Sequence, residues 1–212
     1  MNPEPGNQPR RSQLLTDASG SLSPDLRLGE DGLARPVWAY SSELMQNYYD
    51  TEWGNEVRTE IGLYERISLE GMQAGLSWAT VLNKREAFRE VFHDFDPDIV
   101  AGFSESKIEA LLQDARIIRS RPKISAVISN AEATIRLRDS EGLVEFLWSR
   151  KPQIEYRPAT LRDIPTQSAE SIQLAKDLKA VGYKFIGPTS AFALMEAVGM
   201  VNTHLIGSWR RN

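Results

Sequence analysis

An acidic residue stands where the face of a buried helix is expected. Leu63, Ile67, Glu70, Ala74 and Trp78 follow one another at intervals of four, three, four and four residues, which places them on one helical face. Burying a carboxylate on an apolar face is costly unless it is paired or hydrogen-bonded, and burial shifts its pKa. Glu70 therefore either pairs with an arginine or caps a neighbouring helix, or it accepts hydrogen bonds from a ligand in a pocket.

Aromatic residues are concentrated near this acid in the sequence. Aromatic rings stack on flat groups and attract cations, while a carboxylate accepts a hydrogen bond from an exocyclic amine. Together they could hold a flat, positively charged heterocycle, and the alternative is an ordinary aromatic core. The residues concerned are Trp38, Tyr40, Tyr48, Tyr49, Trp53 and Trp78.

A basic segment joins two expected helices further along the chain. Arg116, Arg119, Arg121 and Lys123 fall within eight residues. A tight turn before a helix N-terminus presents backbone N–H groups and the positive end of the helix dipole to a phosphate. Local positive charge also attracts DNA of any sequence. The segment predicts a phosphate-binding hairpin, with a solvated basic loop as the alternative.

The composition narrows the chemistry that these residues could perform. The 212 residues include 25 basic and 29 acidic side chains, a net charge of −4, so a polyanion would have to meet a local basic patch. The absence of cysteine excludes disulfides, thiol catalysis, iron–sulfur clusters and sulfur-ligated zinc. No apolar run approaches the roughly 18 residues of a membrane span, and no signal-peptide core is seen. We expect a cytoplasmic protein that does not engage membranes.

The elements that must position these residues are helices. We expect an all-α protein with one compact helical domain at 36–212. Residues 1–35 are expected to form a disordered or loosely docked tail, because their prolines and isolated leucines cannot bury enough apolar surface to offset backbone ordering. A short docked turn at 24–28 is compatible with this. Helical periodicity and capping residues predict helices over 59–89, 105–117, 123–138, 143–149, 168–181 and 190–198.

Several motifs, in the same order, resemble the constitutive bacterial 3-methyladenine DNA glycosylases of type I. This resemblance covers about residues 37–207 and implies the helix-hairpin-helix glycosylase fold. It also implies a monofunctional base-excision enzyme that hydrolyses the N-glycosidic bond of 3-methyladenine in alkylated DNA. The motifs that carry it are Tyr49-Asp50-Thr51-Glu52-Trp53-Gly54, Leu69-Glu70-Gly71-Met72-Gln73-Ala74-Gly75-Leu76-Ser77-Trp78, Ile117-Ile118-Arg119, Tyr183-Lys184-Phe185-Ile186-Gly187-Pro188-Thr189 and Gly199-Met200-Val201-Asn202-Thr203-His204.

The resemblance also implies roles for individual residues. Glu70 matches the acid that recognises the flipped alkylated base, Tyr48 and Trp78 match aromatic residues of the base pocket, and Trp38 and Trp53 match tryptophans that help to build it. The expected partner is double-stranded DNA containing alkylated purines, bound by a monomer. The DNA-anchoring hairpin corresponds to Arg116, Arg119, Ser120, Arg121 and Lys123.

The chain departs from the family pattern at three places. The family's zinc ligands correspond here to Pro36, Tyr49, His204 and Ser208, so a single ligand is retained and we expect no zinc and no other cofactor. Arg116 replaces a glycine of the hairpin, and Met45 replaces an aromatic residue of the pocket. These changes leave two alternatives open. One is a homologue whose specificity has shifted to bulkier alkylpurines, and the other is a non-catalytic protein that binds alkylated DNA.

Overall fold

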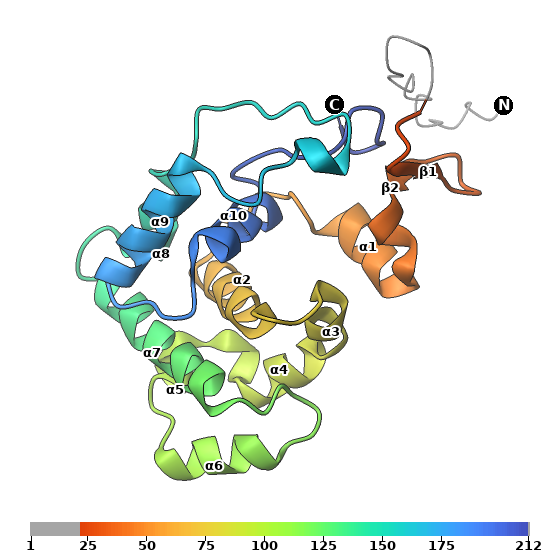
Figure 1. Cartoon of the computed structure of the whole chain (residues 1–212). Coiled ribbons are helices and arrows are strands. Elements are labelled where there is room, and N and C mark those ends of the chain that lie inside the picture. Colours follow the sequence, from red (N-terminus) through yellow and green to blue (C-terminus); the bar gives the residue numbers. More distant parts are fainter. Residues whose placement is uncertain (1–21, 212) are drawn as a thin grey trace, which may run out of the picture.

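The computed structural model describes residues 22–211 and is predominantly helical, which confirms the all-α prediction (Figure 1). Two three-residue strands, β1 (Leu26–Leu28) and β2 (Ala34–Pro36), pair antiparallel with Leu26 opposite Pro36. No helix in this described part is long and apolar enough to cross a membrane. The α-helices are α1 (Glu43–Thr51), α2 (Glu60–Gln73), α3 (Trp78–Asn83), α4 (Arg85–Val91), α5 (Pro97–Val100), α6 (Glu105–Gln113), α7 (Arg121–Leu137), α8 (Gly142–Trp148), α9 (Ala169–Ala180) and α10 (Pro188–Ala197).

Helix α2 lies at the centre of the molecule. It packs against α7, α8 and α10, and Figure 1 shows it enclosed by these helices. Leu63, Tyr64, Ile67 and Leu69 are completely buried in the core. The buried Tyr64 hydroxyl donates to the backbone oxygen of Val127, 2.9 Å away, which ties α2 to α7. The rigid central position of α2 is what fixes the direction of the side chains at its C-terminal end.

Side-chain caps mark several helix starts, as the sequence predicts. Ser104 accepts from the backbone N–H of Lys107 at the start of α6, and Ser168 caps α9 by accepting from Ser171. Such caps satisfy backbone donors that have no partner within the helix. The helices expected near 105–117, 123–138, 143–149, 168–181 and 190–198 are all present as α6, α7, α8, α9 and α10, with ends displaced by a few residues.

The single helix predicted over 59–89 is wrong, because the chain divides it into α2, α3 and α4. The break follows Gln73: Gly75 adopts a φ of +78°, which a helix does not permit and which L side chains rarely adopt. Ser77 then accepts from the backbone N–H of Thr80 and starts a new helix. Trp78 therefore begins α3 and does not share a continuous helix face with Glu70.

The hairpin of β1 and β2 lies within the segment predicted to be a loose tail. Ala34 is completely buried and Arg35 is 2% exposed, and the backbone N–H of Trp209 donates to the Ala34 oxygen over 2.9 Å. The packed part of the chain therefore begins before the predicted boundary at residue 36. The sequence offered little signal here because the strands are only three residues long and ion pairs of Arg35 hold the hairpin alongside the buried Leu26, Ala34 and Pro36. Residues 1–21 lie outside the described part of the chain.

Candidate active site

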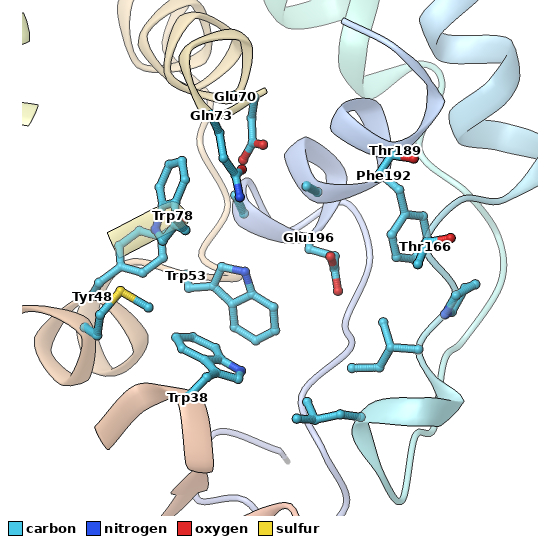
Figure 2. A pocket seen from close by; sticks show the side chains of 16 residues that line it. Trp38, Tyr48, Trp53, Glu70, Gln73, Trp78, Thr166, Thr189, Phe192 and Glu196 are labelled. Carbon is cyan, nitrogen blue, oxygen red and sulfur yellow. The ribbon is translucent and has the colours of Figure 1, made fainter. Parts of the chain in front are cut away.

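A cavity of 470 Å³ lies between α1, α2, α3, α10 and the segment that precedes α9. Figure 2 shows Glu70 and Gln73 on one side of it, Tyr48 and Trp78 on another, and Phe192 and Thr166 opposite these aromatic rings. The lining is Trp38, Met45, Tyr48, Trp53, Glu70, Gln73, Trp78, Leu161, Ile164, Pro165, Thr166, Thr189, Phe192, Ala193, Glu196 and Ala197. Its size and its largely apolar wall with a few polar groups are typical of small-molecule sites.

Glu70 lies in the last turn of α2 and is 4% exposed. Within residues 22–211 its carboxyl group has neither a hydrogen bond nor an ion pair, so neither the arginine pair nor the helix cap considered as alternatives is formed. Burial raises the pKa of Glu70 to about 8, the negative charge of Glu196 adds to this rise, and Arg66 opposes it. A buried acid without a partner can accept hydrogen bonds from a ligand.

The arginines closest to this wall are held by another acid. Glu52 accepts from Arg66 at 2.8 Å and from both terminal nitrogens of Arg85, at 2.6 and 2.9 Å. Burial favours a higher pKa for Glu52, but the two guanidinium groups outweigh it and hold the pKa below the ordinary value. Glu52 binds both guanidinium groups, although Nη1 of Arg66 has no partner in the described chain, and Arg66 acts on Glu70 through its charge alone.

The four aromatic residues predicted to form the base pocket are brought together in the cavity wall. Tyr48 and Trp78 approach to 5.4 Å between ring centroids, and Trp38 meets Trp53 edge-on at 5.5 Å. The Trp78 indole nitrogen is buried and has no hydrogen-bond partner in the described chain. Met45, which the sequence analysis places at a pocket position, also lines the cavity. These rings leave aromatic surfaces for stacking on the wall.

Sequence reasoning missed the far wall of the cavity. Phe192 and Glu196 come from α10, and Thr166 comes from the segment before α9. The one available signal was Glu196, which is the only charged residue of a mostly apolar helix and follows Phe192 by four positions. That spacing puts both residues on one face of α10, but only the tertiary packing of α10 on α2 turns this face towards Glu70.

The residues at the expected zinc positions do not fit a zinc ion. His204 is 5% exposed, and its ring meets Trp53 and Tyr49 edge-on, at 4.7 and 5.4 Å between centroids. A Cβ atom added to Gly54 would lie 2.7 Å from Nε2 of His204, so the chain covers this nitrogen closely. Burial lowers the pKa of His204 to about 3. One imidazole beside proline and hydroxyl side chains does not make a tetrahedral zinc site.

A cluster of ion pairs and hydrogen bonds around Asp50, called the polar knot below, joins the N-terminal hairpin to the C-terminal segment at this place. Asp50 of α1 accepts hydrogen bonds from Arg35 at 2.7 and 2.8 Å and from the indole nitrogen of Trp209 at 3.0 Å. Arg35 also pairs with Asp31, and Arg210 donates to the backbone oxygens of Tyr49 and Asp50. The knot fixes α1, which carries Met45 and Tyr48, to both the N-terminal hairpin and the C-terminal segment.

The predicted DNA-binding residues lie together in and beside the loop between α6 and α7. Arg116 pairs with Asp114 and Glu90, and Arg121 pairs with Glu105 and Glu109. Arg116 is not among the described residues with positive φ, so replacing glycine by arginine does not strain this loop. These ion pairs already neutralise two of the basic side chains that were predicted to bind DNA.

The other members of the loop are arranged differently. Lys123 donates to the backbone oxygens of Met72 and Ala74, at 2.9 and 2.7 Å, and so fastens the turn after α2 to the start of α7. Ser120 is the residue before α7, where its side chain makes no capping hydrogen bond. Arg119 is exposed and has no ion pair among residues 22–211. The loop thus offers one free guanidinium group and a helix N-terminus.

Comparison with known proteins gives a consistent result. The sequence model of the family described as methyladenine glycosylase matches residues 38–211. DNA-3-methyladenine glycosylase 1 of Escherichia coli is 45% identical over 179 residues, covering 82% of this chain and 95% of that protein. The Haemophilus influenzae DNA-3-methyladenine glycosylase is 41% identical over 175 residues, covering 81% of this chain and 94% of its own length.

Solved structures agree with these sequence matches. A crystal structure of a 3-methyladenine DNA glycosylase I has a TM-score of 0.81 and 42% identity, covering 84% of this chain and all of its own. A structure of the Staphylococcus aureus glycosylase, described as showing the basis of 3-methyladenine recognition, has a TM-score of 0.78 and 31% identity and covers 82% of this chain and 96% of that one. The chain therefore belongs to the methyladenine glycosylase family.

Proposed function

We propose that this protein is a DNA glycosylase that removes 3-methyladenine from alkylated DNA by hydrolysing the N-glycosidic bond. The observation that carries the proposal is the unpaired, buried carboxyl group of Glu70 in a cavity walled by aromatic rings. The names of the relatives support the same substrate. The proposal includes monofunctional action without zinc or another cofactor. A cytoplasmic location and a monomeric state stay predictions.

The charge of the damaged base explains why such a pocket suits it. Methylation at N3 gives adenine a positive charge, and its exocyclic amine can donate to the Glu70 carboxylate while its faces meet Tyr48 and Trp78. An unmodified, neutral adenine would bring no positive charge to stabilise the ionised form of Glu70. With its pKa near 8, Glu70 is mostly protonated at neutral pH when no ligand is bound. A bound cationic base favours the ionised form of Glu70, which is the form that accepts its hydrogen bond.

The proposed reaction needs little chemistry from the protein. The damaged nucleotide leaves the helix stack, at a cost of a few kcal/mol that is smallest for a base that pairs poorly. The bond between the sugar C1′ and the base then breaks, its electron pair goes to the base, and the base becomes neutral. Water adds its oxygen to C1′ and loses a proton. No lysine lines the described cavity, which fits hydrolysis rather than a lyase reaction.

The loop between α6 and α7 is the proposed anchor on the DNA backbone. Arg119 provides a free positive charge, and the start of α7 provides backbone N–H groups and the positive end of its dipole. Arg116 and Arg121 are engaged by carboxylates, so they contribute only where phosphates displace those acids. Fewer than the four predicted basic residues are therefore free to contact a phosphate.

Replacing Arg119 by alanine is expected to weaken binding to undamaged duplexes of any sequence. One lost phosphate contact reduces the slope of log affinity against log salt concentration by about 1. Fluorescence anisotropy at several salt concentrations measures this slope. The matched control is Lys176→Ala, which removes an exposed cation from α9, away from the loop (Figure 1). An unchanged slope in Arg119→Ala would show that Arg119 makes no phosphate contact.

Release of bases from DNA treated with dimethyl sulfate tests the proposed function directly. We expect 3-methyladenine to appear in the supernatant, as detected by chromatography, and no base to be released from untreated DNA. Release of other or bulkier alkylpurines without 3-methyladenine would favour the substrate-shifted alternative. Tight binding of methylated DNA without any release would favour a non-catalytic binder.

A further inference from the structure

A second acid faces the cavity and has no role in the reaction described above. Glu196 extends from α10, and Figure 2 shows its carboxyl group directed into the space between Trp53 and Phe192. It is the only charged residue in α10, whose other side chains are mostly buried and apolar. A lone acid at such a place is costly to the fold unless it has a function or a strong partner.

The partners of Glu196 satisfy only part of its carboxyl group. The buried Thr203 hydroxyl donates to Oε1 over 2.6 Å, and in the described chain no hydrogen bond reaches Oε2 and no cation forms an ion pair with either oxygen. Glu196 therefore brings negative charge to the cavity that no described residue balances.

The two acids of the cavity influence one another. The negative charge of Glu196 contributes to the raised pKa of Glu70, and burial raises the pKa of Glu196 itself to about 7, against the effect of the Thr203 hydroxyl. Two carboxyl groups that share a site repel each other when both are ionised. A cation placed between them removes this repulsion, whereas a neutral molecule of the same shape does not.

We propose that Glu196 is a second specificity-determining acid of the base pocket, which with Glu70 makes the cavity select a positively charged alkylated purine over a neutral purine. The proposal rests on the proposed function and extends it from one recognising carboxyl group to a pair on facing helices. Glu70 approaches the ligand from α2 and Glu196 from α10, so a flat cation lies between two sources of negative charge. Glu196 does not have to touch the base, because charge acts over several ångströms in an enclosed site.

Two small probes separate charge from shape. The 3,9-dimethyladeninium ion is permanently charged and resembles the damaged base with its glycosidic substituent, and 9-methyladenine is its neutral counterpart. Quenching of tryptophan fluorescence reports binding, because Trp38, Trp53 and Trp78 line the cavity. For the unaltered protein we expect clearly tighter binding of the cation. No preference for the cation in the unaltered protein would contradict the proposed function itself.

Glu196→Gln is expected to lower the affinity for the cation about tenfold and to leave the affinity for 9-methyladenine unchanged or slightly higher. Glutamine keeps the size of the side chain and an oxygen that accepts from Thr203. Thr203→Val, which removes the donor but keeps the charge, should retain the preference for the cation. If both probes weaken equally in Glu196→Gln, or neither changes, while the unaltered protein prefers the cation, Glu196 has only a structural role. Glu196→Asp keeps the charge and should keep most of the preference, and it serves in the same comparison if the glutamine variant does not fold.

Discussion

Replacing Glu70 by glutamine is expected to reduce the release of 3-methyladenine from methylated DNA by about 100-fold or more. The variant keeps the length of the side chain but loses the negative charge that balances the cationic base in a buried site. Removing one member of a buried, hydrogen-bonded charge pair typically costs about 2–5 kcal/mol, which corresponds to this loss. Initial rates on dimethyl sulfate-treated DNA measure the effect, and Glu70→Ala, which also removes the acceptor, should lose at least as much.

Stability provides the control that separates this loss from misfolding. The pKa of Glu70 in the folded protein, about 8, lies above its ordinary value of 4.5, so its contribution to stability is fully present below about pH 4.5 and is lost as the pH rises through 8. Glutamine does not titrate. The Glu70→Gln variant should therefore gain stability relative to the unaltered protein between pH 5 and pH 8, as measured by urea unfolding. Full base release by a folded glutamine variant would refute the role of Glu70.

Of the substitutions proposed for this protein, replacing Asp50 by alanine is expected to cause the largest loss of stability. Arg35 is 2% exposed, and removal of Asp50 takes away the acceptor of three of its hydrogen bonds and of the Trp209 indole. Breaking a buried ion pair by removing one member typically costs about 3–5 kcal/mol, because a charge stays buried without its partner. Asp31 still pairs with Arg35 from the surface, so we expect about 3 kcal/mol, measured as the free energy of unfolding in urea.

The matched control for Asp50→Ala is Asp98→Ala. Asp98 also accepts two hydrogen bonds from an arginine, Arg138, but it lies on the surface, where solvent screens the pair and Glu60 remains as a second partner. Asp98→Ala should unfold close to the unaltered protein. Equal effects of the two substitutions would show that the knot around Asp50 does not hold the N-terminal hairpin to the C-terminal segment. Because α1 carries Tyr48 and Met45 into the cavity, Asp50→Ala should also lower base release.

The near wall of the cavity was predictable because its residues lie within short, distinctive motifs. Glu70 interrupts an apolar periodicity, and Trp38, Tyr48, Trp53 and Trp78 are rare residue types close to it in the sequence. The turn after Gln73 was not predictable from propensity, because the surrounding residues favour helix and one glycine is tolerated inside many helices. The break is nevertheless what allows Trp78 to approach Tyr48 from a separate helix.

The far wall of the cavity and the ion pairs of the basic loop between α6 and α7 depend on contacts between distant parts of the chain. Glu196 reaches the cavity only because α10 packs on α2. Arg116 and Arg121 read as free cations in the sequence, but Glu90 on α4 and Glu105 and Glu109 on α6 neutralise them. Local composition does not reveal these pairs, since Glu90, Glu105 and Glu109 lie 12 to 26 positions away, whereas Asp114, the other partner of Arg116, lies two positions away. The same holds for the pair of Arg35 with Asp50, which lies 15 positions away.

The knot of Arg35, Asp50 and Trp209 has a consequence for the conditions under which the protein keeps its shape. Its contacts consist of ion pairs and hydrogen bonds between nitrogen and oxygen atoms, and it contains no thiolate. A chelating agent or a thiol-directed oxidant therefore has no target among the contacts that join the N-terminal hairpin to the C-terminal segment. Removal of metal ions is therefore expected to leave these contacts intact.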